Sequence, residues 1–314
     1  MLKRLKKINP YTAARSFLQN IRLWDTTTTV YHVLTILWDK IIRFDIDVRA
    51  AAVAYNFTLA VFPTIIFLFS LIAYIPIEHL DKSIMEFLAD AMPIGLYTEA
   101  AGTIEEIVSK PRGGVLSLGF LFALYASTSG MMALMRAFNQ TYKTVENRGF
   151  IKAWMIAIML NFLLTFMLFT AILFLIIGRL VIDVLFDNGI LNKDITFYAI
   201  QAITYLVIFG VFFLSVSIIY YIAPAIHNRW KFFNTGSVTA SILIILSTNL
   251  FSYYLSNFAS YNRLYGSIGT IIDLMVWIYL IALILLLGFE INASLDHAKK
   301  LSAEQLQEKF LEQS

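Results

Sequence analysis

The sequence predicts an all-α fold, a polytopic membrane protein with six transmembrane helices and extra amphipathic helices at the N-terminus and in the first outer loop. Its composition is the first indication. Of 314 residues, 59% are hydrophobic and 14% are charged, whereas soluble domains are ~45–50% apolar and ~25% charged. A chain of this size cannot enclose so much apolar surface in its own core. The excess therefore predicts contact with lipid.

Six apolar runs are the second indication, because a spanning helix needs ~20 mostly apolar residues. The runs are continuous and too long for barrel strands, so their backbones must be satisfied as helices. They cover residues 50–75, 114–138, 153–177, 198–222, 235–257 and 269–293. We therefore expect an N-terminal segment over 1–49, a transmembrane domain over 50–293 and a tail over 294–314.

The distribution of basic residues predicts the orientation. With the N-terminus inside, the inner segments hold 18 Lys and Arg residues and the outer segments hold 6. Cytoplasmic loops carry such an excess. We expect a multi-pass protein of the bacterial cytoplasmic (inner) membrane with both termini in the cytoplasm.

Two flanking segments have helical patterns of their own. Before the first span, apolar residues recur at helical spacing, namely Val30, Leu34, Leu37 and Ile41. They predict an amphipathic helix on the inner surface, which serves either as an anchor or as a lipid-regulated element. In the first outer segment, two short amphipathic helices are expected on either side of Pro93. Its acidic residues form either a solvated face or a vestibule that attracts cations.

Polar residues at membrane depth are the candidate functional residues, because they are costly there and usually face the bundle interior or a wet cavity. They are Arg49, Asn56, Pro63, Arg136, Asn139, Asp273, Glu290 and Asn292. Pro63 frees a carbonyl one turn earlier and predicts a kink. The kink is either plain packing or a broken-helix binding site.

The charged members of this set are expected near the ends of spans. Arg49, Arg136 and Glu290 are expected at one depth near the cytoplasmic surface. Arg136 either snorkels to the interface or pairs with an acid at the start of the first span. Asp273 lies one turn inside the last span and is either a functional acid or an interfacial residue with local hydrogen bonds.

No catalytic, cofactor-binding or metal-binding residues are predicted. The chain has no cysteine, and its four histidines lie outside the spans without metal-ligand spacing. Hydrolase and phosphate-loop motifs are also missing. We expect no enzyme, no cofactor and no nucleic-acid partner, since the basic N-terminal segment is short and hydrophobic.

Several spaced motifs occur in order from about residue 45 to residue 295. They are Arg49–Tyr55 with Pro63; Ser127–Gly130 with Arg136, Ala137 and Asn139; Tyr142 and Glu146; Tyr221, Pro224, Trp230 and Gly236; and Tyr254, Tyr265, Gly266, Ser267, Gly269, Trp277, Gly288, Glu290, Asn292 and Ala293. This pattern resembles the YihY/BrkB family of bacterial inner-membrane proteins, formerly mislabelled ribonuclease BN.

The resemblance implies links to envelope integrity and export but no settled molecular activity. In the family, the position of Asp273 is more often apolar, which shifts weight to Arg49, Arg136 and Glu290. We expect a transporter, an exporter or a lipid-handling protein with a polar cavity inside the helix bundle. The alternative is a non-transporting scaffold for envelope assembly or integrity. Expected partners are membrane lipids and a small-molecule, ion or lipid substrate, and the oligomeric state is left open.

Overall fold

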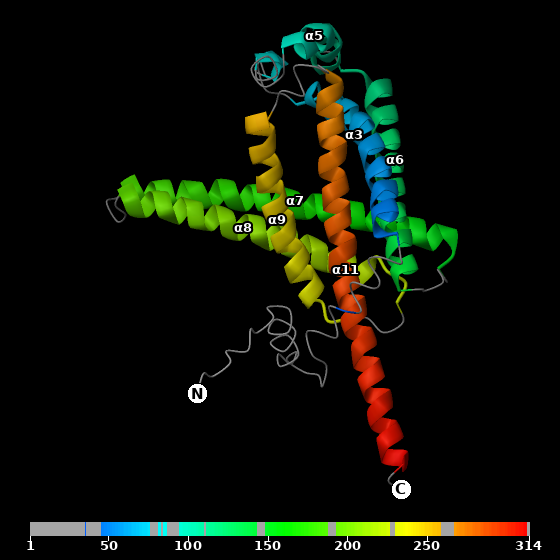
Figure 1. Ribbon diagram of the computed structural model, residues 1–314. Helices are drawn as coiled ribbons and strands as arrows, with labels where there is room; N and C mark the ends of the chain where they lie inside the picture. Colours follow the sequence, from blue (N-terminus) through cyan, green and yellow to red (C-terminus); the bar gives the residue numbers. More distant parts are fainter. Residues whose placement is uncertain are drawn as a thin grey trace, which may run out of the picture.

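The computed structural model describes residues 35, 45–75, 81–82, 84–86, 94–109, 111–142, 148–187, 193–226, 230–258 and 267–312. Its regular elements in these ranges are all helices (Figure 1). They are α3 (Ile46–Ile72), α5 (Ile94–Ser109), α6 (Gly113–Thr141), α7 (Phe150–Asp187), α8 (Lys193–Ile222), α9 (Thr235–Phe258) and α11 (Ser267–Glu312). Six of them, all except α5, are long and apolar enough to cross a membrane. The predicted number and order of spans are therefore confirmed.

The flanking helices are confirmed in part. Helix α5 lies in the predicted outer segment and buries Ile104 and Val108. The predicted N-terminal amphipathic helix, with Val30, Leu34, Leu37 and Ile41, falls outside the described residues.

Two helices run well past the predicted ends of their spans. Helix α7 continues to Asp187 and α11 continues to Glu312, beyond the expected boundary at residue 293. Hydropathy marks where lipid contact ends, but a helix continues until its sequence supplies a stop signal. The stretch after residue 293 contains good helix formers such as Ala, Glu, Gln and Leu. The last part of α11 therefore extends away from the other helices (Figure 1).

Helices α3 and α6 form the most extensive helix pair. Two glycines of α6 admit α3 closely: a Cβ on Gly119 would lie 3.3 Å from the Cα of Phe67, and one on Gly130 would lie 2.9 Å from the ring of Phe57. Small residues of this kind allow close approach of helices in membranes. Pro63 lies inside α3, which is described as a single helix from Ile46 to Ile72.

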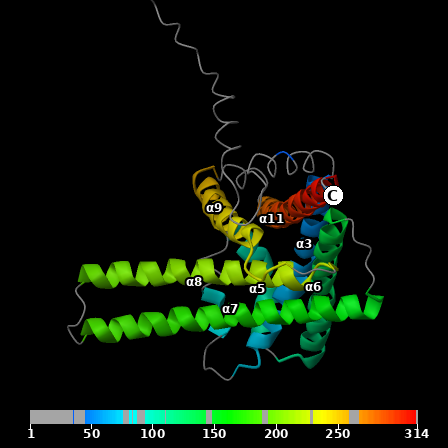
Figure 2. The same ribbon diagram turned by 90° about the horizontal axis from the view of Figure 1, so that it is seen from below.

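Helices α7 and α8 form a hairpin that runs across α3, α6, α9 and α11 in both views (Figures 1 and 2). In an apolar 18-residue stretch of each helix, 44% of the residues of α6 are buried, compared with 17% of those of α7 and 17% of those of α8. Both hairpin helices are apolar on all sides, so neither has a polar stripe that would indicate which face packs. The sequence therefore predicts that these helices exist, but it does not predict how they cross the others.

An aromatic cluster joins α6, α8 and α11 in the core. The rings of Phe138 and Phe289 stack with their centroids 4.3 Å apart, and Tyr220 meets each of them edge-on at 5.7 Å. Stacked and edge-to-face pairs are both favourable for aromatic rings. The buried hydroxyl of Tyr220 donates a hydrogen bond to the carbonyl oxygen of Leu285 at 2.7 Å. The cluster is therefore fully packed and its polar atom is satisfied.

Helices α9 and α11 touch at two glycines. A Cβ on Gly236 would overlap the carbonyl oxygen of Gly288, and a Cβ on Gly288 would lie 2.7 Å from the Cβ of Ala240. Only a residue without a side chain fits at either position. This contact, here called the glycine crossing, fixes the distance between the two backbones.

We predict that Gly236→Ala lowers the stability of the protein, because its methyl group would push the α11 backbone away. Overpacking of a tight contact costs about 1–3 kcal/mol. The measurement is thermal unfolding of the detergent-purified protein. Gly210→Ala is the matched control, since Gly210 also lies within a helix but has nothing within 4 Å of an added Cβ. Equal unfolding temperatures for the two variants would contradict the prediction.

Candidate functional site

Arg49 joins the start of α3 to the last turn of α6. Its Nη1 donates hydrogen bonds to the carbonyl oxygen of Ala137, at 3.0 Å, and to the hydroxyl of Thr141. A cation near the C-terminal end of a helix complements the helix dipole. Within the described residues, the buried Nε and Nη2 atoms of Arg49 have no hydrogen-bond partner.

Glu290 of α11 supplies the opposite charge. Its side chain is 1% exposed, and it interacts electrostatically with Arg49, as does Asp45 more weakly. Buried charges are costly unless they are paired. The two residues were expected at one depth, and in the structure they interact at the end of the bundle that also holds Asn139, here called the inner end after the orientation predicted from the basic residues.

Two buried asparagines form hydrogen bonds to neighbouring elements through their side-chain amides. Asn139 of α6 accepts a hydrogen bond from the backbone N–H of Ala225, at 2.8 Å, just after α8 ends. Asn292 of α11 accepts one from the backbone N–H of Gly236 at 2.8 Å and donates one to the side chain of Asn234 at 2.6 Å. Gly236 lies in the first turn of α9, where backbone N–H groups need outside partners. Asn292 therefore caps a helix to which it does not belong.

The other predicted residues lie apart from this group. Arg136 is on an exposed position of α6 and has no ion pair with a described residue. Asn56 donates a hydrogen bond to the carbonyl oxygen of Ala52 at 2.8 Å, within its own helix. The side chain of Asp273 is partly exposed and lines a cavity of about 390 Å³ with Thr248 and Ser252. These residues are therefore not part of one polar site.

A further polar cluster, which the sequence reasoning missed, lies at the inner end. The hydroxyl of Tyr142 donates a hydrogen bond to Asp296, and Lys300 lies 2.9 Å from both the carboxylate of Asp296 and the hydroxyl of Tyr142. Burial, and after it the bond to Asp296, raises the pKa of Tyr142 above its ordinary value. The i, i+4 spacing of Asp296 and Lys300 could have predicted their ion pair from the sequence. The contact with Tyr142 could not have been predicted, because Tyr142 is distant in sequence.

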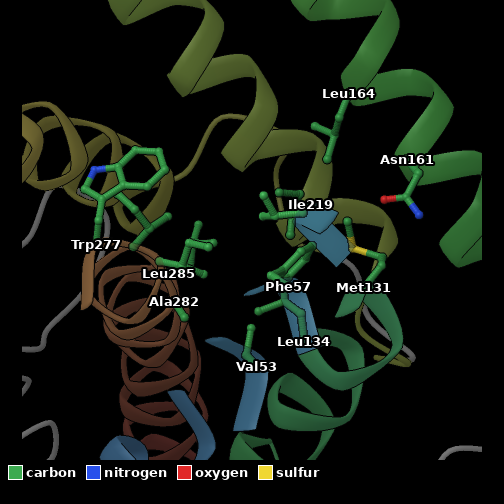
Figure 3. Close-up of a pocket in the computed structure, with 13 residues that line it drawn as sticks. Val53, Phe57, Met131, Leu134, Asn161, Leu164, Ile219, Trp277, Ala282 and Leu285 are labelled. Carbon is green, nitrogen blue, oxygen red and sulfur yellow. The ribbon is translucent and has the colours of Figure 1, made fainter. Parts of the chain in front are cut away.

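The space where the hairpin crosses the other helices is mostly apolar. A cavity of about 310 Å³, here called the central cavity, lies between α3, α6, α7, α8 and α11 (Figure 3). It is lined by Val53, Phe57, Val61, Met131, Leu134, Asn161, Leu164, Ile219, Trp277, Ile278, Ile281, Ala282 and Leu285. A second cavity, of about 420 Å³, shares Leu164, Ile219, Ile281 and Leu285 with it. The two cavities therefore adjoin where the hairpin crosses the other helices. This differs from the expected polar cavity.

Asn161 is the one amide on the wall of the central cavity. It projects from α7 at the edge of the group of lining residues in Figure 3. Its Nδ2 lies 3.5 Å from the hydroxyl oxygens of both Ser127 and Thr128, so both contacts are long.

Metal ligands are not grouped in the described part of the chain. No set of three or more His, Cys, Asp or Glu side chains there is placed to hold a metal ion. The expectation that the chain is not an enzyme stays a prediction.

Comparison with known proteins gives a family match. Residues 37–310 match the family model described as virulence factor BrkB. A ribonuclease-like protein, YfkH, of Bacillus subtilis (strain 168) is 35% identical over 256 residues, which is 82% of this chain and 92% of YfkH. A UPF0761 membrane protein of Psychromonas ingrahamii is 24% identical over 281 residues, which is 88% of this chain and 91% of that protein. No solved structure matches.

We predict that Arg49→Met lowers the folded abundance and the unfolding temperature, because Glu290 would keep a buried charge without its cationic neighbour. The variant also loses the hydrogen bonds of Arg49 to α6, and hydrogen bonds to a charged group contribute about 1.5–3 kcal/mol. The double variant Arg49→Met, Glu290→Gln should recover part of this loss. The measurements are yield and thermal unfolding in detergent, with the exposed Arg136→Met as control. The prediction fails if the Arg136 and Arg49 variants behave alike.

Proposed function

Since the chain belongs to the BrkB family, we propose that it is a lipid-handling membrane protein that holds the hydrocarbon part of an amphiphilic lipid in the central cavity. The family match covers residues 37–310 and confirms the resemblance predicted from the sequence. The membrane assignment rests on the six apolar helices and on related proteins named as membrane proteins.

The apolar wall of the central cavity is the observation that carries the proposal. An ion or a polar solute would lose its hydration there without gaining hydrogen bonds, which is costly. A hydrocarbon chain has no hydration to lose there. The central cavity and the adjoining cavity measure about 310 and 420 Å³, within the usual range of ~300–1,000 Å³ for ligand pockets. The lining therefore favours lipid over an ion or a polar solute.

Asn161 supports the same proposal, because an amphiphile needs a polar contact as well as an apolar one. An amide side chain offers two N–H donors and an acceptor oxygen. Both of its described contacts are long, at 3.5 Å, so it can turn to a ligand at little cost. An ester or hydroxyl group of a lipid is a fitting partner.

The orientation of the chain is part of the proposal. With 18 basic residues in the predicted inner segments and 6 in the outer ones, the inner end faces the cytoplasm of a bacterial cell. Both termini then lie in the cytoplasm, and the protein belongs to the cytoplasmic (inner) membrane.

A second candidate function is a non-transporting scaffold for envelope assembly. It is favoured by the hydrogen bonds that join neighbouring elements through the side chains of Arg49, Asn139 and Asn292. In that case the polar residues serve only to hold helices together, and the cavity has no occupant. Lipid retention distinguishes the two functions.

We predict that Ala282→Phe reduces the lipid retained by the purified protein about tenfold, which corresponds to ~1.4 kcal/mol. Ala282 is 3% exposed and lines the central cavity, so a phenyl ring there would occupy the space of the ligand. The measurement is native mass spectrometry after detergent exchange, with thermal unfolding to verify the fold. Val276→Phe is the control, because Val276 lies on the same helix but is 42% exposed. Equal retention by both folded variants would refute the proposal.

A further inference from the structure

Another cavity lies at the inner end, and charged residues form part of its wall. It measures about 720 Å³ and lies where the segment between α8 and α9 meets α11. We call it the basal cavity. Its lining residues are Trp230, Lys231, Phe233, Asn234, Thr235, Val238, Thr239, Asn292, Leu295, Asp296 and Lys299. Neither the central cavity nor the cavity beside Asp273 has a lysine or arginine on its wall.

The charge of the basal cavity is positive. Lys231 and Lys299 are exposed, and their side-chain ammonium groups form no ion pair or hydrogen bond with the residues that the structure describes. Asp296, the acid on the wall, is already engaged by Lys300 at 2.9 Å and by the hydroxyl of Tyr142. Its negative charge is therefore balanced outside the cavity. Two unbalanced ammonium groups remain to attract an anion.

The N-terminus of α9 does not supply this site. The backbone N–H of Gly236 donates to Asn292, and that of Ser237 donates to Asn234, each at 2.8 Å. These first-turn groups are used within the protein, so they are not open to a ligand. The lysines are therefore the groups that select the charge of a ligand.

The remaining wall is apolar and aromatic. Phe233 is 60% exposed and Val238 is 39% exposed, and both line the cavity with Trp230 and Leu295. Aromatic side chains beside lysines are typical of the membrane–water interface. A ligand with a compact anion next to apolar groups matches both parts of the wall, and a bare metal cation matches neither.

We infer that the basal cavity binds a phosphate-bearing anion through Lys231 and Lys299. The anion comes from either of two sources, the headgroup of an acidic membrane lipid or a free phosphate compound. This site is separate from the central cavity, because the two cavities share no lining residue and Gly288 and Phe289 lie between their wall residues along α11. The inference therefore does not depend on the proposed function.

The test is isothermal titration calorimetry, in which the full-length, detergent-purified protein is titrated with each of four probes. The probes are dihexanoyl phosphatidylglycerol, dihexanoyl phosphatidylcholine, glycerol 3-phosphate and inorganic phosphate. Lys231→Gln and Lys299→Gln should each weaken the binding of the anionic probe about fivefold, the factor that corresponds to ~1 kcal/mol per basic residue at a membrane surface. Binding should also weaken as salt rises, because exposed charges are screened.

Lys152→Gln is the matched control, since Lys152 is an exposed lysine of α7 that lies on no described cavity wall. Tighter binding of the phosphatidylglycerol than of glycerol 3-phosphate identifies a lipid source, and equal binding identifies a free phosphate compound. Both results support the inference when the two cavity variants weaken binding and the control does not. The inference is overturned if no phosphate probe binds, if phosphatidylcholine binds equally well, or if all three lysine variants behave alike. Monodisperse elution of each variant verifies its fold.

Discussion

The glycine crossing sets the position of nearly everything at the inner end. Because Gly236 and Gly288 have no side chains, α9 and α11 meet backbone to backbone. One turn beyond Gly288, Asn292 then reaches the first turn of α9 and satisfies the N–H of Gly236. The next residue of α11 after Gly288, Phe289, stacks on Phe138 and brings α6 into contact. The cap, the aromatic cluster and the wall of the basal cavity all depend on this single short separation.

Most of the polar side chains that join helices lie apart from the central cavity. Arg49, Asn139 and Asn292 point to backbone or side-chain atoms of other elements. The central cavity and the cavity that adjoins it are lined almost entirely by aliphatic and aromatic groups. In lipid, a hydrogen bond between helices is a means of assembly, because burial of apolar surface gives little driving force there. These polar residues thus mark contacts between helices, and the apolar central cavity is where a hydrocarbon chain fits.

The sequence predicted the six spans because length and apolarity alone define them. It also predicted Arg49, Arg136 and Glu290 at one depth, since all three lie near the ends of their spans, and in the structure Arg49 interacts electrostatically with Glu290. It could not show that Arg136 is exposed, because the buried face of α6 depends on how α3 packs against it. The crossing of the hairpin was equally hidden, since α7 and α8 are apolar all round. The central cavity arises from that crossing and has no motif of its own.

The length of α11 has a mechanical consequence. The helix runs without a break from Ser267 to Glu312, about 70 Å at 1.5 Å per residue. Along this length it contributes Asp273, Trp277, Ala282 and Lys299 to the walls of different cavities. Because one unbroken helix carries residues from all of these walls, a displacement of α11 along its axis would move parts of several cavities together.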